Sequence, residues 1–112
     1  MYQPLGKMAF SCCSDEGFVE KIDALKRDTL VLAGMETHVC VQQTALEALS
    51  LGYKVHVVAD AVTSRRREDW GAAIDKLRHA GAIITTTEMV AYEWIGRAGT
   101  PEFKGAMPYL KW

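Results

Sequence analysis

Hydrophobic positions along the chain change repeatedly between helical and strand spacing. Apolar residues three and four positions apart, separated by charged ones, predict amphipathic helices over residues 16–25, 37–51 and 70–80. Short and almost purely apolar runs, typical of parallel strands covered on both faces, occupy residues 29–34, 53–59 and 82–85. Because strands alternate with helices, we predict an α/β fold with an open parallel sheet and helices on both of its faces.

Threonines near the starts of the predicted helices are candidates for their caps. We expect Thr37 to cap the helix after the first strand and Thr87 to cap a helix that runs to Ile95. We also expect Thr100 to cap a last short helix, because Pro101 follows it and proline is favoured in the first helical turn. Three strands make a narrow sheet, so we expect uncovered edges unless another segment pairs with them.

Composition indicates one ordinary globular domain over residues 1–112. Of the 112 residues, 49% are hydrophobic and 24% charged, and 13 basic side chains nearly balance 14 acidic ones, for a formal net charge of −1. This balance gives the chain no general attraction for nucleic acid or an anionic membrane surface, so we expect neither partner. No apolar run approaches the roughly 20 residues that span a bilayer.

Cysteine usage and the first residues predict a cytoplasmic location. The chain begins without the basic and apolar segments of a secretory signal, and its three cysteines cannot all pair within one chain. Cys12 and Cys13 are adjacent, a spacing that suits neither a metal site nor a disulfide framework. A reducing compartment therefore fits best.

The residues that follow each predicted strand are the candidates for chemistry, since ligands of open α/β sheets bind beyond the carboxyl ends of the strands. After the first strand, Cys40 falls in the first turn of the next helix. Unpaired N–H groups and the positive end of the helix dipole favour a thiolate there, and the same N–H groups can hold an oxyanion. A small buried cysteine that fills the helix–sheet contact is an equally good interpretation of this spacing alone.

Other polar residues near strand ends give weaker signals. We expect Asp60 to accept backbone hydrogen bonds in a turn, and the arginines at 65–67 to form a solvated surface. His38 lies two residues from Cys40, a poor placement for a general base. No histidine pair has zinc-ligand spacing and no glycine-rich phosphate loop is present, so we expect no metal and no cofactor.

A resemblance to the isochorismatase-like cysteine hydrolases begins at the run Gly34-Met-Glu-Thr-His-Val-Cys-Val41. It continues at Thr44-Ala45, Gly52-Tyr53, Val57-Val58, Asp60-Ala61, Ser64-Arg65, Ala80-Gly81-Ala82, Thr85-Thr86-Thr87-Glu88 and Pro101-Glu102-Phe103-Lys104. Lys7, with Phe10-Ser11, is similar to the family's lysine-containing segment. The resemblance covers nearly the whole chain, and it implies a three-layer, Rossmann-like sheet.

The resemblance also implies roles for four residues. Cys40 matches the family's nucleophile, which attacks a carbonyl or imine-like carbon through a covalent intermediate, and Lys7 matches the catalytic lysine. Lys7 would then favour the thiolate as a cationic neighbour. Without the resemblance, Lys7 would be interpreted as a solvated surface lysine. The backbone amides of Glu36 and Cys40 match the oxyanion hole, and the Met35–Glu36 peptide bond matches the family's cis bond.

The family's catalytic aspartate has no counterpart, because only six residues precede Lys7 and neither Asp15 nor Asp60 matches it. The chain resembles roughly the C-terminal two-thirds of a family member, so we expect a hydrolase domain that is incomplete, truncated at its N-terminus. The expected substrate is a small amide, ester or vinyl-ether-like molecule. Weak or no turnover is expected, since loss of a general base costs about 10²- to 10⁴-fold.

A second hypothesis is a non-catalytic fragment that acts only through association with itself or a partner. An uncovered parallel edge favours self-association, so a homo-oligomer is expected. Large apolar side chains could supply contact area, although most of them could equally belong to the core. They are Trp70, Trp94, Phe103, Tyr109 and Trp112.

Overall fold

The computed structural model describes residues 4–110, apart from the side chain of Glu16. Its strands are β1 (Thr29–Met35), β2 (Lys54–Thr63) and β3 (Ile83–Thr85). Its α-helices are α1 (Glu16–Ala24), α2 (Gln42–Ser50), α3 (Arg67–Ala80), α4 (Thr87–Ile95) and α5 (Pro101–Ala106). Three shorter helical turns are η1 (Cys12–Ser14), η2 (Thr37–Val41) and η3 (Met107–Tyr109). The alternation predicted from the hydrophobic pattern is confirmed.

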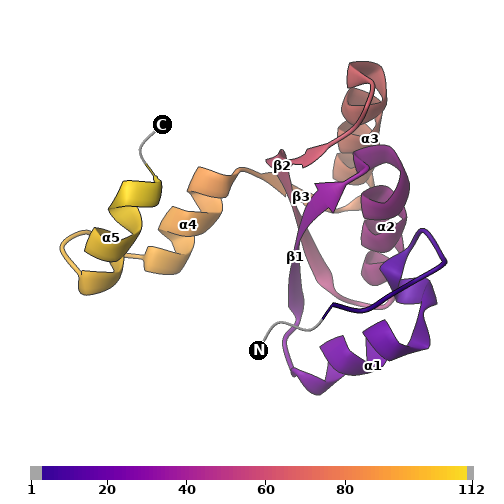
Figure 1. Ribbon diagram of the computed structural model, residues 1–112, viewed down its shortest axis with the longest axis horizontal. Coiled ribbons are helices and arrows are strands. Elements are labelled where there is room, and N and C mark those ends of the chain that lie inside the picture. The colour runs from indigo at the N-terminus through magenta and orange to yellow at the C-terminus, as the bar shows by residue number, and fades with distance from the viewer. Residues whose placement is uncertain (1–3, 111–112) are drawn as a thin grey trace.

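The three strands form one parallel sheet in the order β1-β2-β3. Helices α2 and α3 lie side by side against one face of it, while α4 and α5 extend from the other side as an arm (Figure 1). The pairing of β1 with β2 shifts between Leu32 and Gly34, so that Met35 pairs with Thr63 at the carboxyl end. The α/β fold is therefore as predicted, with the carboxyl ends of β1 and β2 at one edge.

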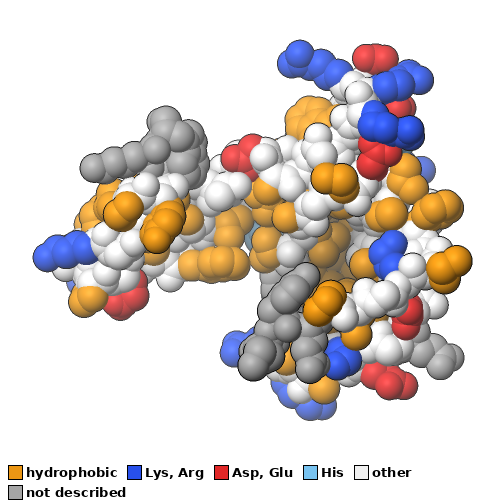
Figure 2. Space-filling model, viewed as in Figure 1, with side chains coloured by type: hydrophobic (Ala, Val, Ile, Leu, Met, Phe, Trp, Pro, Cys, Tyr) orange, Lys and Arg blue, Asp and Glu red, His pale blue; other side chains and the backbone are white. Residues whose placement is uncertain are grey.

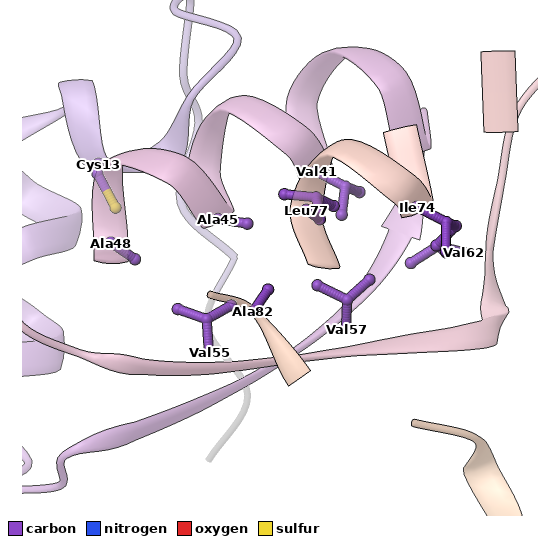
Figure 3. Packing of buried hydrophobic residues seen from close by; sticks show 10 residues of the cluster. All are labelled: Cys13, Val41, Ala45, Ala48, Val55, Val57, Val62, Ile74, Leu77 and Ala82. Carbon is purple, nitrogen blue, oxygen red and sulfur yellow. The ribbon is translucent and has the colours of Figure 1, made fainter. Parts of the chain in front are cut away.

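The hydrophobic core lies between the sheet and the α2–α3 layer. Leu77 of α3 and Val57 of β2 are fully buried, and Val55 is 1% exposed. Figure 3 shows the side chains of α2 and α3 pointing down onto β2. The buried cluster consists of Cys13, Val41, Ala45, Ala48, Val55, Val57, Val62, Ile74, Leu77 and Ala82. Burial of these side chains supplies the main stabilisation of the fold.

The opposite face of the sheet is only partly covered. Helix α4 faces this side of the sheet across an apolar recess. The recess is lined by Thr87, Val90, Ala91 and Trp94 of α4 and by Val31, Ala33, Val58 and Ala61 of the sheet. Trp94 is nevertheless 76% exposed and Met35 is 69% exposed. Figure 2 shows hydrophobic side chains along the arm and in the recess between the arm and the sheet. Helix α4 thus reaches the second face without closing it.

Two predicted helix caps are wrong by one residue. Glu36, not Thr37, occupies the N-cap position of η2, and Thr37 is fully buried. Its Oγ1 has no hydrogen-bond partner among the described residues. Thr86, not Thr87, caps α4 by accepting from the Met89 amide, because both the amide and the hydroxyl of Thr87 donate to Asp60. The prediction for Thr100 is confirmed, since its hydroxyl accepts from the Phe103 amide.

Strand β2 and helix α3 are longer than the sequence pattern predicts. The strand continues from the expected end at Ala59 to Thr63, because Val62 is buried against the core and β1 supplies pairing partners as far as Met35. Asp60 therefore lies within a strand and not in a turn. Between residues 4 and 110, no helix is long and apolar enough to cross a membrane.

Candidate active site

The candidate site is built where β1 ends. Gly34 has a φ of +118°, a backbone conformation that glycine adopts without strain, and the following Met35–Glu36 peptide bond is cis. The chain then enters η2, a single π-helical turn in which the Val41 amide donates to the Glu36 carbonyl at 3.2 Å. Cys40 is half-buried on this turn, immediately before α2. Single π-helical turns are found disproportionately at functional sites.

Lys7 reaches Cys40 from the N-terminal segment. Its ammonium nitrogen lies 3.7 Å from the Cys40 sulfur and donates to the carbonyl oxygens of Ala9 and Phe10, each at 2.9 Å. These two hydrogen bonds curve residues 7–10 around the ammonium group and keep its positive charge beside the Cys40 thiol. The Lys7 ammonium group is thus placed to donate a hydrogen bond to the Cys40 sulfur.

Lys7 and Cys40 share a cavity of about 160 Å³. Its walls come from the N-terminal segment (Lys7, Cys12), from β1 (Leu32, Ala33, Met35), from η2 (Cys40, Val41) and from α2 (Thr44). None of these lining residues is acidic. The cavity therefore offers a small, mostly apolar space with one cation and two thiols.

The turn that carries Cys40 is fixed to the segment between β2 and α3. The Glu36 carboxylate accepts hydrogen bonds from the Arg65 amide at 2.8 Å and from Arg65 Nε at 2.9 Å. His38 Nδ1 lies 2.9 Å from the Ser64 hydroxyl, and His38 Nε2 lies 3.7 Å from the Asp69 carboxylate. His38 thus binds residues that follow β2, and within residues 4–110 Cys40 is not among its hydrogen-bond or ion-pair partners. These contacts hold the start of η2.

Several polar residues flagged by the sequence lie elsewhere. Asp60 holds the start of α4 through Thr87, and the Asp15 side chain accepts from the Gly17 amide at the start of α1. Arg65, Arg66 and Arg67 are all exposed, as expected for a solvated surface, and Arg65 also binds Glu36. Within residues 4–110, no three His, Cys, Asp or Glu side chains form a group that could hold a metal ion.

Besides the π-helical turn η2, sequence reasoning missed two tertiary features of the site. Cys12 lines the cavity beside Cys40, although its position next to Cys13 carried no signal of this. The Glu36–Arg65 contact was also missed, although both residues follow neighbouring parallel strands, whose carboxyl ends meet at one edge. The order of the strands was therefore the signal that could have found the second feature.

Comparison with known proteins decides the family. The profile described as the isochorismatase domain matches residues 3–89. The chain belongs to the isochorismatase family. A curated relative, the secreted isochorismatase effector Isc1 of Phytophthora sojae, is 43% identical over 86 residues, which are 77% of this chain and 41% of the relative.

Solved structures of the family share the fold. The MAR1 ribonuclease of Caenorhabditis elegans superposes with a TM-score of 0.85 at 36% identity, over 93% of this chain and 53% of that one. The Escherichia coli YcaC gene product, described as an octameric hydrolase of unknown specificity, gives a TM-score of 0.75 at 28% identity, over 95% of this chain and 57% of that one. Among curated relatives, this isochorismatase-family chain spans from 29% to 53% of the relative's length.

Proposed function

We propose that this chain carries the nucleophile side of an isochorismatase-type cysteine hydrolase. The observation that carries the proposal is the 3.7 Å approach of the Lys7 ammonium to the Cys40 sulfur inside a small cavity. The Cys40 thiolate attacks the carbonyl carbon of a small amide or ester, or the corresponding carbon of a vinyl-ether-like molecule. With an amide or ester, the C–N or C–O bond breaks, and the amine or alcohol leaves with a proton. Water then attacks the remaining thioester, the C–S bond breaks, and the acid and the Cys40 thiol are released.

The backbone amides of Glu36 and Cys40 are proposed to hold the negative charge that develops on the substrate oxygen. Both lie at the π-helical turn that follows the cis bond, and the Glu36–Arg65 contact keeps this turn in place. Preorganised donors of this kind stabilise a tetrahedral intermediate more than water does. Lys7 adds a positive charge on the same cavity wall.

Turnover is proposed to be slow, because no carboxylate among the described residues lines the cavity to accept the thiol proton. Loss of such a base lowers rates by about 10²- to 10⁴-fold. The proposed substrate is a small molecule in the cytoplasm, where the three free cysteines remain reduced. The balanced charge of the chain supports neither a nucleic acid nor a membrane as partner.

Reaction with an activated ester tests the nucleophile. After incubation with p-nitrophenyl acetate, we expect one acetyl group on Cys40, located by peptide mass spectrometry. The Cys40→Ser variant should release nitrophenol at least about 10²-fold more slowly, since an unassisted hydroxyl is a poor nucleophile. Cys13→Ala is the matched control and should acetylate as the parent chain does. Acetylation of Cys12 with equal speed, or of lysines alone, would contradict the proposal.

Self-association is a second candidate function, supported by the partly open face of the sheet. Met35 and Trp94 are both more than two-thirds exposed, and Tyr109 is 80% exposed on the arm. Phe103 instead packs near Tyr92, with ring centroids 6.4 Å apart, and Trp70 packs against the core. Trp112, also proposed as a contact residue, lies outside the described residues. Exposed apolar surface of this kind marks interaction sites.

Sedimentation tests this association. We expect a native mass above the 12.4 kDa of one chain, and we expect Trp94→Glu to weaken self-association at least about tenfold, because a carboxylate would have to be buried in the contact. Leu51→Glu, at a residue 51% exposed at the end of α2, should leave the mass unchanged. A monomer at all concentrations would rule association out.

A further inference from the structure

A second thiol lies in the same cavity as the proposed nucleophile. Cys12 and Cys40 come from segments 28 positions apart in the sequence, yet both line the space that Lys7 also borders. Both side chains are half-buried and carry free thiols. A cavity large enough for a small substrate also admits a hydroperoxide. The two sulfurs therefore share one access route.

The position of Cys12 is fixed against the helix that Cys40 precedes. The Cys12 amide donates to the Thr44 hydroxyl at 2.9 Å, and Thr44 is 4% exposed in the wall of the same cavity. Thr44 stands about one helical turn after Cys40, so the two residues lie on the same side of this segment. The Ser11 hydroxyl also accepts from the Cys13 amide and thereby shapes the turn η1.

The neighbouring Cys13 faces another way. Its sulfur lies in the core beside Ala48 (Figure 3), and its thiol donates to the Thr44 carbonyl at 3.8 Å. Burial, together with the nearby Glu47 carboxylate, raises the pKa of the Cys13 thiol. Cys13 is thus a structural cysteine, and its adjacency to Cys12 provides a matched control.

We propose, on the basis of the proposed function of Cys40, that Cys12 is its resolving thiol and that a hydroperoxide converts the pair into a disulfide. The Cys40 thiolate attacks one peroxide oxygen, the O–O bond breaks, and the other oxygen leaves with the electron pair and takes up a proton. Cys12 sulfur then attacks the Cys40 sulfenic acid, the S–O bond breaks, and water leaves with the Cys12 proton. The two sulfurs lose two electrons in total, and the peroxide gains them.

A disulfide between Cys12 and Cys40 would inactivate the site and protect Cys40 from irreversible oxidation. A disulfide removes the nucleophile reversibly, whereas further oxidation of a sulfenic acid to the sulfinic acid is irreversible without dedicated repair. Cys12 lies on the short turn η1, and Cys40 lies on η2 at the end of β1, so neither is in the middle of a strand or long helix. The backbone movement needed to bring the two cysteines to disulfide geometry would therefore be taken up by these two short turns.

Treatment of the reduced chain with a slight excess of hydrogen peroxide tests the proposal. We expect the intact mass to fall by two hydrogen atoms, the cross-link to map to Cys12 and Cys40, and dithiothreitol to restore both thiols. In Cys12→Ala, Cys40 should instead gain oxygen and form sulfinic acid at least about tenfold faster than in the parent chain. Cys13→Ala should form the same cross-link as the parent. Cys12→Ser provides a second variant that keeps a polar side chain at this position.

Three results would overturn the proposal. They are a cross-link between Cys12 and Cys13 or between two chains, equal sulfinic acid formation with and without Cys12, and no oxidation of Cys40. Failure here is distinguishable from failure of the proposed function. If p-nitrophenyl acetate acetylates Cys40 but peroxide forms no Cys12–Cys40 disulfide, only the redox proposal is contradicted. If the disulfide forms but Cys40 is not acetylated, only the hydrolase proposal is contradicted.

Discussion

Replacing Leu77 with alanine should lower the free energy of unfolding by about 2 to 5 kcal/mol, measured by urea denaturation. Leu77 has no exposed surface and lies in the cluster between α3 and the sheet. Its truncation removes apolar contacts and leaves a cavity that the neighbouring helices cannot fill. Such a loss is a large fraction of the stability of a small domain.

Two further variants control this experiment. Leu77→Met roughly conserves volume and should cost less than about 1.5 kcal/mol. Leu51→Ala, at a leucine 51% exposed, should change stability by no more than about 0.5 kcal/mol. Equal losses at Leu77 and Leu51 would mean that the core does not lie between α3 and the sheet.

Replacing Lys7 with methionine should lower the alkylation rate of Cys40 at neutral pH about tenfold, because it removes a positive charge and a hydrogen-bond donor 3.7 Å from the attacking sulfur. Methionine keeps an unbranched side chain of similar length and removes only the charge and the donors. The rate is measured with iodoacetamide, with the modified cysteine identified by mass spectrometry. The rate at Cys12 should change less.

Lys54→Met is the control for this charge effect. Lys54 lies at the start of β2, where its 72% exposed side chain pairs with Asp28, and it does not line the cavity. The variant should alkylate at Cys40 as fast as the parent chain does. An equal slowing in Lys7→Met and Lys54→Met would show that net charge, and not the placement of Lys7, sets the reactivity.

Hydrophobic spacing was sufficient to predict the order of helices and strands. The strand at residues 29–35 has a continuous aliphatic run, but the prediction that it is covered on both faces is wrong, because its residues are only half-buried or exposed. Helix α3 has an apolar stripe that ends at Gly81, whose φ of +109° is typical of a helix stop. Element ends were less certain, because pairing partners set them. Strand β2 runs to Thr63 since β1 supplies neighbours there, which no local pattern of β2 encodes.

The candidate site was predictable only in part. Cys40 stands out because it follows a strand, but the pairing of Lys7 with it depends on a segment without regular structure, so only the resemblance to a family pointed to Lys7. The π-helical turn was missed because its residues have ordinary helical character, which led to the wrong cap at Thr37. Cys12 was missed because its place in the cavity depends on a tertiary hydrogen bond to Thr44.

The central claim is that Cys40 is an assembled nucleophile, and site-resolved alkylation of the three cysteines by iodoacetamide from about pH 5 to about pH 9 tests it most directly. We predict that Cys40 reacts fastest of the three cysteines at every pH. Cys13 should react only as the pH becomes alkaline, since burial raises the pKa of its thiol. If Cys40 is inert, or reacts with the same rate and pH dependence as Cys12, the chain has the fold of the family without its nucleophile.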